Sequence, residues 1–184
     1  MQKGVVIAGF GGQGVMLAGE LLAEAGKDEE KFVTFLPSYG PEMRGGTANC
    51  DVIISDKPIA SPVIGHPEAA IIMNLPSLDK FEPLMKENGL LILNKTLIPR
   101  EVKRKDVRVL QIDAQTVARE LGNEKVTNMI LLGAYAEIEK PVKLESLKKA
   151  LKHFLTGKKE KLIPINEKAL DKGAEIAREF LGGK

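Results

Sequence analysis

The fold is decided by Val5-Val6-Ile7-Ala8-Gly9-Phe10-Gly11-Gly12-Gln13-Gly14, an apolar run that breaks into four glycines within six residues. The apolar part predicts a buried strand. Ala18, Leu21, Leu22 and Ala25 then recur at helical spacing, so a helix with one apolar face begins at the glycines. Its free N–H groups and the positive end of its dipole would point at the glycine turn. The stretch therefore predicts a site for a phosphate, a carboxylate or an acidic partner.

The spacing of Gly9, Gly11 and Gly14 matches half of the dinucleotide-binding fingerprint. The other half is an acidic residue about 20 positions further on, at the end of the second strand, which holds the ribose. Here the second apolar run, residues 32–36, ends in Pro37-Ser38-Tyr39, and the nearby acidic residues precede it. The glycines thus favour a close-approach corner, and a flavin or nicotinamide site stays open as the alternative.

Length, charge and cysteine content bound the class of protein. A chain of 184 residues with 43% hydrophobic content predicts one domain over residues 1–184. The net charge of +2, from 27 basic and 25 acidic residues, argues against a nucleic-acid or membrane partner. We find no secretory signal pattern and expect a cytoplasmic protein. Cys50 is the one cysteine, and with His66 and His153 far apart in sequence we expect no metal ligands.

A second glycine-rich segment is Pro37-Ser38-Tyr39-Gly40-Pro41-Glu42-Met43-Arg44-Gly45-Gly46, in which five of ten residues are proline or glycine. This composition predicts a loop rather than a helix or regular strand. If the first two strands are parallel, the loop leaves the same sheet edge as the glycine corner and faces it. Its phenol, carboxylate and guanidinium groups could then contact an anion, since the fork of Arg44 suits phosphate. The alternative is a surface ion pair between Glu42 and Arg44.

The remaining pattern predicts an α/β protein. Residues 47–54 read as a strand that follows too soon for a helical crossover, so it should run antiparallel and make the sheet mixed. Strands at 69–74, 90–94 and 107–110 follow, the first two joined by a helix and therefore parallel. Three caps are predicted for the helical second half, namely Asp113, Asn123 and Asn166.

Two helical segments carry small residues where an apolar helix would normally carry large ones. Met129 to Ala136 is apolar all round and contains Gly133, while Gly173 and Ala174 lie on the apolar stripe of the last helix. Glycine inside a helix costs about 1 kcal/mol relative to alanine, which indicates close packing against a neighbour or a partner chain. These segments are candidate contact surfaces through which the free chain would self-associate.

Three segments together resemble the gamma subunits of 2-oxoacid:ferredoxin oxidoreductases: residues 9–14, residues 38–47 and residues 128–133. The resemblance covers nearly the whole chain. It implies a three-layer α/β/α fold with a mixed, mostly parallel sheet and a Rossmann-like first half. It also implies an enzyme that cleaves a 2-oxoacid, joins the acyl group to coenzyme A and reduces ferredoxin. Within this resemblance, the pair Pro41-Glu42 before Arg44 indicates an enzyme for 2-oxoglutarate, pyruvate or branched-chain 2-oxoacids, and we favour 2-oxoglutarate slightly.

The resemblance also assigns the cofactors and partners. Thiamine diphosphate and its Mg²⁺ would lie in alpha and beta subunits, and the iron–sulfur clusters in cysteine-rich chains such as a ferredoxin-like delta subunit. The isolated chain would then be inactive and carry no catalytic residue. The candidate residues near coenzyme A are Gly9, Gly11, Gly12, Gln13, Gly14, Tyr39, Glu42, Arg44 and Gly45. Stand-alone alternatives are a nucleotide-binding Rossmann-like module and a flavin or nicotinamide oxidoreductase.

Overall fold

The computed structural model describes residues 1–39 and 47–183. They contain a mixed sheet with the strand order β2-β3-β1-β4-β5-β6. The strands are β1 (Gln2–Phe10), β2 (Phe32–Tyr39), β3 (Thr47–Ser55), β4 (Ala69–Ile72), β5 (Leu90–Asn94) and β6 (Arg108–Ile112). The adjacent strands β1, β4, β5 and β6 run parallel to one another. β3 lies between β1 and β2 and runs antiparallel to both. The predicted mixed, mostly parallel sheet is confirmed.

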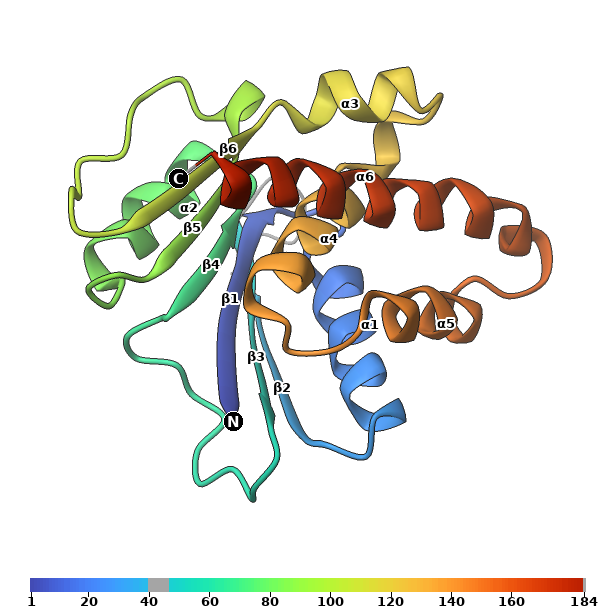
Figure 1. The fold of residues 1–184 in the computed structure, drawn as a ribbon, viewed down its shortest axis with the longest axis horizontal. Coiled ribbons are helices and arrows are strands. Elements are labelled where there is room, and N and C mark those ends of the chain that lie inside the picture. The colour runs from blue at the N-terminus through green and yellow to red at the C-terminus, as the bar shows by residue number, and fades with distance from the viewer. Residues whose placement is uncertain (40–46, 184) are drawn as a thin grey trace.

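Helices cover both faces of this sheet, which confirms the three-layer prediction (Figure 1). The helices are α1 (Val15–Asp28), α2 (Leu75–Phe81), α3 (Ala114–Glu120), α4 (Thr127–Glu139), α5 (Leu144–Phe154) and α6 (Ile163–Gly182). The described residues also contain the short 3-10 turns η1 (Glu82–Leu84), η2 (Lys95–Leu97), η3 (Glu124–Val126) and η4 (Gly157–Leu162). The large core packs α1, α4, α5 and α6 on one sheet face, and α2 closes the smaller core on the other.

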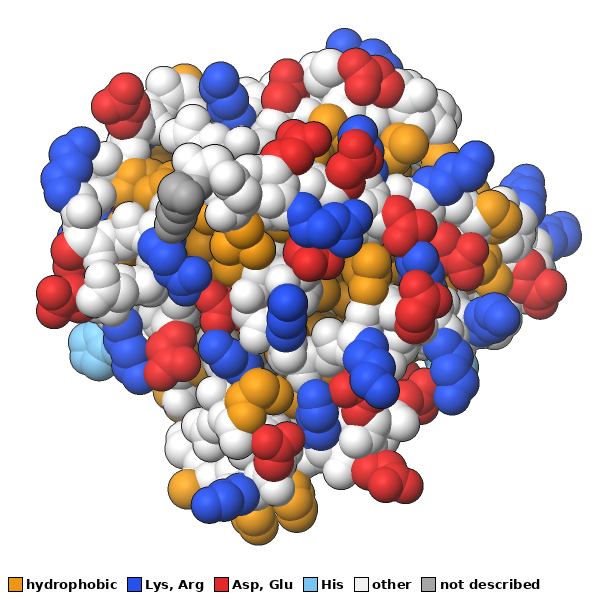
Figure 2. Space-filling view, viewed as in Figure 1, with side chains coloured by type: hydrophobic (Ala, Val, Ile, Leu, Met, Phe, Trp, Pro, Cys, Tyr) orange, Lys and Arg blue, Asp and Glu red, His pale blue; other side chains and the backbone are white. Residues whose placement is uncertain are grey.

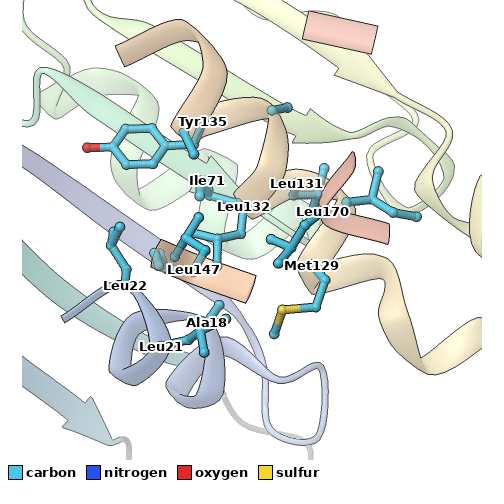
Figure 3. Close-up of a cluster of buried hydrophobic side chains, with 14 of the residues drawn as sticks. Ala18, Leu21, Leu22, Ile71, Met129, Leu131, Leu132, Tyr135, Leu147 and Leu170 are labelled. Carbon is cyan, nitrogen blue, oxygen red and sulfur yellow. The ribbon is translucent and has the colours of Figure 1, made fainter. Parts of the chain in front are cut away.

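Alternation along β1 explains how one strand serves both cores. Val5 and Ile7 belong to the larger core, whereas Val6 and Ala8 belong to the smaller one, as a period of two residues requires. Figure 3 shows the larger core, in which side chains of α1, α4, α5 and α6 meet Ile71 of β4. Parallel strands buried on both faces need continuous apolar sequence, which is why the run at 5–8 identifies a central strand.

The second strand is longer than predicted. Pro37, Ser38 and Tyr39 belong to β2 and pair with β3, although their composition indicates a loop. β2 lies at the edge of the sheet, where a proline is tolerated because its missing N–H is not needed by a neighbouring strand. β1 and β2 are parallel as predicted, but β3 lies between them.

The packing of α4 on α6 corrects one prediction. A Cβ at Gly133 would overlap the backbone of Leu170, and one at Gly173 would overlap the backbone of Ile130. The two helices therefore touch backbone to backbone within one chain (Figure 1). Gly133 and Gly173 are buried here, so the expectation that they form surfaces for self-association is wrong.

The start of α6 also differs from the prediction. The helix begins at Ile163, with Pro164 in its first turn, and Asn166 lies inside it with its Nδ2 donating to Leu162 O at 2.7 Å. Proline is pre-organised for the first helical turn, so it sets the start before the asparagine does. The cap at Asp113 is confirmed, because it accepts from Thr116 N. Asn123 accepts from Lys125 N and caps η3 instead of α4, the helix for which it was predicted.

The visible surface carries both signs of charge. On the face shown in Figure 2, basic and acidic side chains are interspersed over the helices, in keeping with the net charge of +2. Within the described residues, no helix combines the length and the hydrophobicity that a membrane crossing requires.

The contact between α4 and α6 leads to a stability prediction. Gly173→Ala should lower the free energy of unfolding by about 3 kcal/mol, because the added methyl group meets backbone that cannot move aside. Gly182→Ala is the matched control in the same helix, since nothing lies within 4 Å of a Cβ there. Urea titrations of both variants measure the difference. Equal stability of the two variants would contradict the close contact.

Candidate glycine-corner site

The side chain of Gln13 holds the glycine corner together. Its Oε1 accepts a hydrogen bond from Phe10 N at 2.6 Å, and its Nε2 donates to Met73 O at 3.4 Å. The backbone N–H of Gln13 also donates to Phe10 O at 3.2 Å. The turn between β1 and α1 is thereby fixed to the end of β4, so the corner is built before any ligand binds.

The glycines of this corner meet different requirements. A Cβ at Gly9 would lie 2.6 Å from Gln13 Oε1 and 2.9 Å from Met73 Cβ, so Gly9 is needed for packing behind the turn. Gly12 has φ of +94° with open space around it, which only glycine adopts without strain. Gly14 has φ of +76° and is the N-cap residue of α1.

The amino end of α1 is free to bind an anion. No side chain of the described residues caps it, and its first turn contains no acidic residue. The first hydrogen bond of the helix runs from Ala18 N to Gly14 O, so the N–H groups before it have no helical acceptor. Together with the helix dipole they favour negative charge at Gly12 and Gly14.

A groove with a volume of about 590 Å³ lies against this helix end. One wall is the glycine corner, and the other is formed by α3, η3 and the start of α4. The lining residues are Gly12, Gln13, Gly14, Leu17, Gln115, Glu124, Lys125, Thr127 and Asn128. Asn128 joins the two walls, because its Nδ2 donates to Gly14 O at 3.1 Å.

Lys125 adds positive charge to the groove. Its side chain is exposed, and none of the ion pairs found among the described residues involves it. The acidic neighbour in the groove, Glu124, is engaged by Arg119 at 3.1 Å. The ammonium of Lys125 is thus free for an anionic ligand that also contacts the amino end of α1.

The structure brings only part of the predicted site together. Gly12, Gln13 and Gly14 line the groove, Gly9 packs behind it and Gly11 lies on the exposed turn. Tyr39 is the last residue of β2. Glu42, Arg44 and Gly45 lie outside the described residues. The strand ends on either side of them can be placed, since Tyr39 pairs with Ala48 and Phe10 pairs with Thr47. β2 therefore ends, and β3 begins, at the same sheet edge as the corner.

Three lining residues, Gln115, Lys125 and Asn128, were not predicted as site residues. They lie more than 100 residues after the corner in sequence and reach it only because α4 packs beside α1 and α3 packs on α4. One local signal was present. Asn128 is a polar amide at the start of an otherwise apolar helical run, and buried amides usually serve a partner.

Cys50 does not fit an iron–sulfur or zinc ligand. Its side chain is buried under α1, with Sγ 3.8 Å from Val15 O, and burial raises the pKa of its thiol to about 12. Clusters need thiolates, usually four of them. Among residues 1–39 and 47–183 no group of three or more His, Cys, Asp or Glu side chains could hold a metal ion. His66 is exposed, with its Nδ1 3.2 Å from Leu84 O.

The different roles of Gly9 and Gly12 can be tested by matched substitutions. Gly9→Ala should lower the free energy of unfolding by about 3 kcal/mol, because the methyl group has no room beside Met73. Gly12→Ala should cost about 1 kcal/mol, from backbone strain alone, and should keep a cooperative transition. Thermal or urea unfolding of both variants measures this. An unfolded Gly12→Ala chain would show that the turn is needed for folding and would remove it as evidence of a binding site.

Comparison with known proteins finds relatives over nearly the whole chain. A family profile described as pyruvate ferredoxin/flavodoxin oxidoreductase matches residues 4–176. A ketoisovalerate oxidoreductase subunit VorA from Methanothermobacter thermautotrophicus is 36% identical over 98% of the chain, but the chain spans only 37% of that relative's length. A 2-oxoglutarate synthase subunit KorC from Methanocaldococcus jannaschii is 33% identical over 98% of the chain and 96% of its own length.

A solved structure shows the same fold. The keto/oxoacid ferredoxin oxidoreductase gamma subunit from Geobacter sulfurreducens superposes with a TM-score of 0.83 at 30% sequence identity. The match covers 96% of this chain and 99% of that one.

Proposed function

This chain belongs to the pyruvate ferredoxin/flavodoxin oxidoreductase family, and we propose that it is the gamma subunit of a multisubunit 2-oxoacid:ferredoxin oxidoreductase. The complex would convert a 2-oxoacid, coenzyme A and oxidised ferredoxin into acyl-coenzyme A, CO2 and reduced ferredoxin. The KorC relative supports 2-oxoglutarate as the substrate, and the VorA relative supports the branched-chain 2-oxoacid that the resemblance also allows.

The observation that carries the proposal is the uncapped amino end of α1 in a groove that also holds Lys125. Coenzyme A is the reactant with phosphate groups, and phosphate suits a helix amino terminus with a cation nearby. We therefore assign the chain the task of holding coenzyme A, with Gly12, Gln13 and Gly14 closest to it. The other predicted residues of the corner, Gly9 and Gly11, would shape the turn that makes this approach possible.

The second glycine-rich segment would complete the site. Thr47, which follows it, pairs with Phe10 of the corner, and Tyr39 lies at the same sheet edge on the far side of β3, which supports a role for Tyr39, Glu42, Arg44 and Gly45 at the same ligand. Arg44 would contact a phosphate of coenzyme A or a carboxylate of a neighbouring subunit, because a guanidinium pairs with either through two parallel hydrogen bonds.

The redox and carbanion chemistry would belong to other chains. Cleavage next to a carbonyl needs an electron sink such as thiamine diphosphate, and one-electron transfer needs clusters, which side chains cannot replace. The alpha and beta subunits would supply thiamine diphosphate and Mg²⁺, and a ferredoxin-like delta subunit the clusters. A buried thiol without a partner cysteine suits the reducing cytoplasm, where we place the complex.

We also propose that residues 1–184 form one domain. The two hydrophobic cores lie on opposite faces of the same sheet and share β1, β4 and β5, so neither could form without the other. The stand-alone dinucleotide enzyme is not favoured. The position of the ribose-binding acid, at the end of β2, is occupied by Tyr39, and β2 is not adjacent to β1.

Dependence on partner subunits is the first functional prediction. Purified alone, the chain should not reduce ferredoxin or a viologen dye with any 2-oxoacid. Addition of the thiamine-binding and cluster-bearing subunits should give reduction that depends on coenzyme A, with 2-oxoglutarate preferred over 3-methyl-2-oxobutanoate. Turnover by the isolated chain would contradict the subunit assignment. Full activity of the other subunits without this chain would reduce it to an accessory.

The second functional prediction concerns the substitution Arg44→Lys. The substitution keeps the charge but removes the planar fork, so the assembled enzyme should lose about tenfold in kcat/KM for coenzyme A, or should assemble poorly. Lys57→Arg, the reverse exchange on an exposed turn at the opposite sheet edge, is the control. Normal coenzyme A kinetics together with normal assembly of Arg44→Lys would end the proposed role.

A further inference from the structure

Two amide oxygens in the groove have no hydrogen-bond donor in the described part of the chain. They are Oδ1 of Asn128 and Oε1 of Gln115, and both atoms are buried. Asn128 is only 3% exposed, and Asn128 and Gln115 both line the groove beside the glycine corner. A buried acceptor without a donor costs about 1–3 kcal/mol, a cost that a ligand N–H would remove.

The orientation of the Asn128 amide is fixed by its neighbour. Its Nδ2 donates to Gly14 O at 3.1 Å, and a flipped amide would place two oxygens against each other. Oδ1 must therefore be the atom that stays unpaired. The Asn128 amide is also packed closely against the corner, because a Cβ on Gly14 would overlap it.

The groove thus offers hydrogen-bond donors on one wall and hydrogen-bond acceptors on the other. The corner wall offers donors, from the amino end of α1, and Lys125 adds a cation. The wall formed by α3 and α4 offers the acceptors of Gln115 and Asn128. An inorganic anion satisfies only the first wall. A ligand that satisfies both carries a phosphate group and, within the same groove, an amide or amine N–H.

We propose that Asn128, assisted by Gln115, is the specificity-determining acceptor of this groove, and that it selects phosphorylated ligands bearing an N–H donor over simple phosphates. The inference rests on the proposed function, in which coenzyme A, with its amides and adenine amine, occupies the groove. Asn128 then has two tasks. Its nitrogen holds the Gly14 peptide, and its oxygen recognises the ligand.

The test compares two ligands on the full-length chain by amide NMR titration, which also measures weak binding. The probes are coenzyme A, with both features, and inorganic pyrophosphate, with the anion alone. Gln115→Met should weaken coenzyme A by about tenfold and change pyrophosphate by less than about twofold, whereas Asn128→Ala, which also removes the bond to Gly14 O, should weaken coenzyme A about tenfold more than pyrophosphate. Gln111→Met, on the exposed side of β6, is the control of identical chemistry and should change neither.

Two further readouts separate the outcomes. In the wild-type chain the side-chain NH2 signals of Asn128 should shift with coenzyme A and stay in place with pyrophosphate. Equal weakening of both ligands would show that the variants only deform the corner. Unchanged coenzyme A affinity in both variants would also overturn the inference, while leaving the proposed function intact. If coenzyme A shifts no amide of Gly12 or Gly14 in the wild-type chain, the proposed function itself fails.

Discussion

The backbone contact between α4 and α6 positions the functional end of the molecule. Gly173 lies against the carbonyl of Ile130, two residues after Asn128, and Gly133 lies against the carbonyl of Leu170. Because neither contact leaves room for a side chain, α6 fixes the position of α4 along its axis. The start of α4 is thereby placed on Gly14, and Asn128 can join the two walls of the groove. Stability and site geometry depend on the same pair of glycines.

The groove that results is asymmetric in its hydrogen bonding. Donors lie at the corner between β1 and α1, and unpaired acceptors lie on the opposite side. This arrangement suits binding and orientation of a phosphorylated ligand, and it contains no pair of groups set up for acid–base or nucleophilic catalysis within the described residues. It accords with our proposal that the gamma subunit presents coenzyme A to chemistry carried out by neighbouring subunits.

Sequence reasoning was successful where the signal is local. The strand at 5–8, the glycine turn and the cap at Asp113 follow from periodicity and turn chemistry over a few residues. It failed where tertiary context decides. Pro37 to Tyr39 form a strand because they lie at a sheet edge, and Gly133 proved to pack inside the chain rather than on a partner. Gln115, Lys125 and Asn128 could not be assigned to the site because their proximity to Gly14 depends on how the helices pack.

Hydrogen exchange of the full-length chain, with and without coenzyme A, tests the central claim most directly, because it reports which backbone amides the ligand covers. With coenzyme A bound, we expect slower exchange of the backbone amides at the turn after β1, at the first turn of α1 and at the start of α4. A second groove, lined by Gln2, His66 and Lys86, lies at the opposite sheet edge and serves as an internal reference. Protection confined to that reference groove, or no protection anywhere, would contradict a coenzyme A site at the glycine corner.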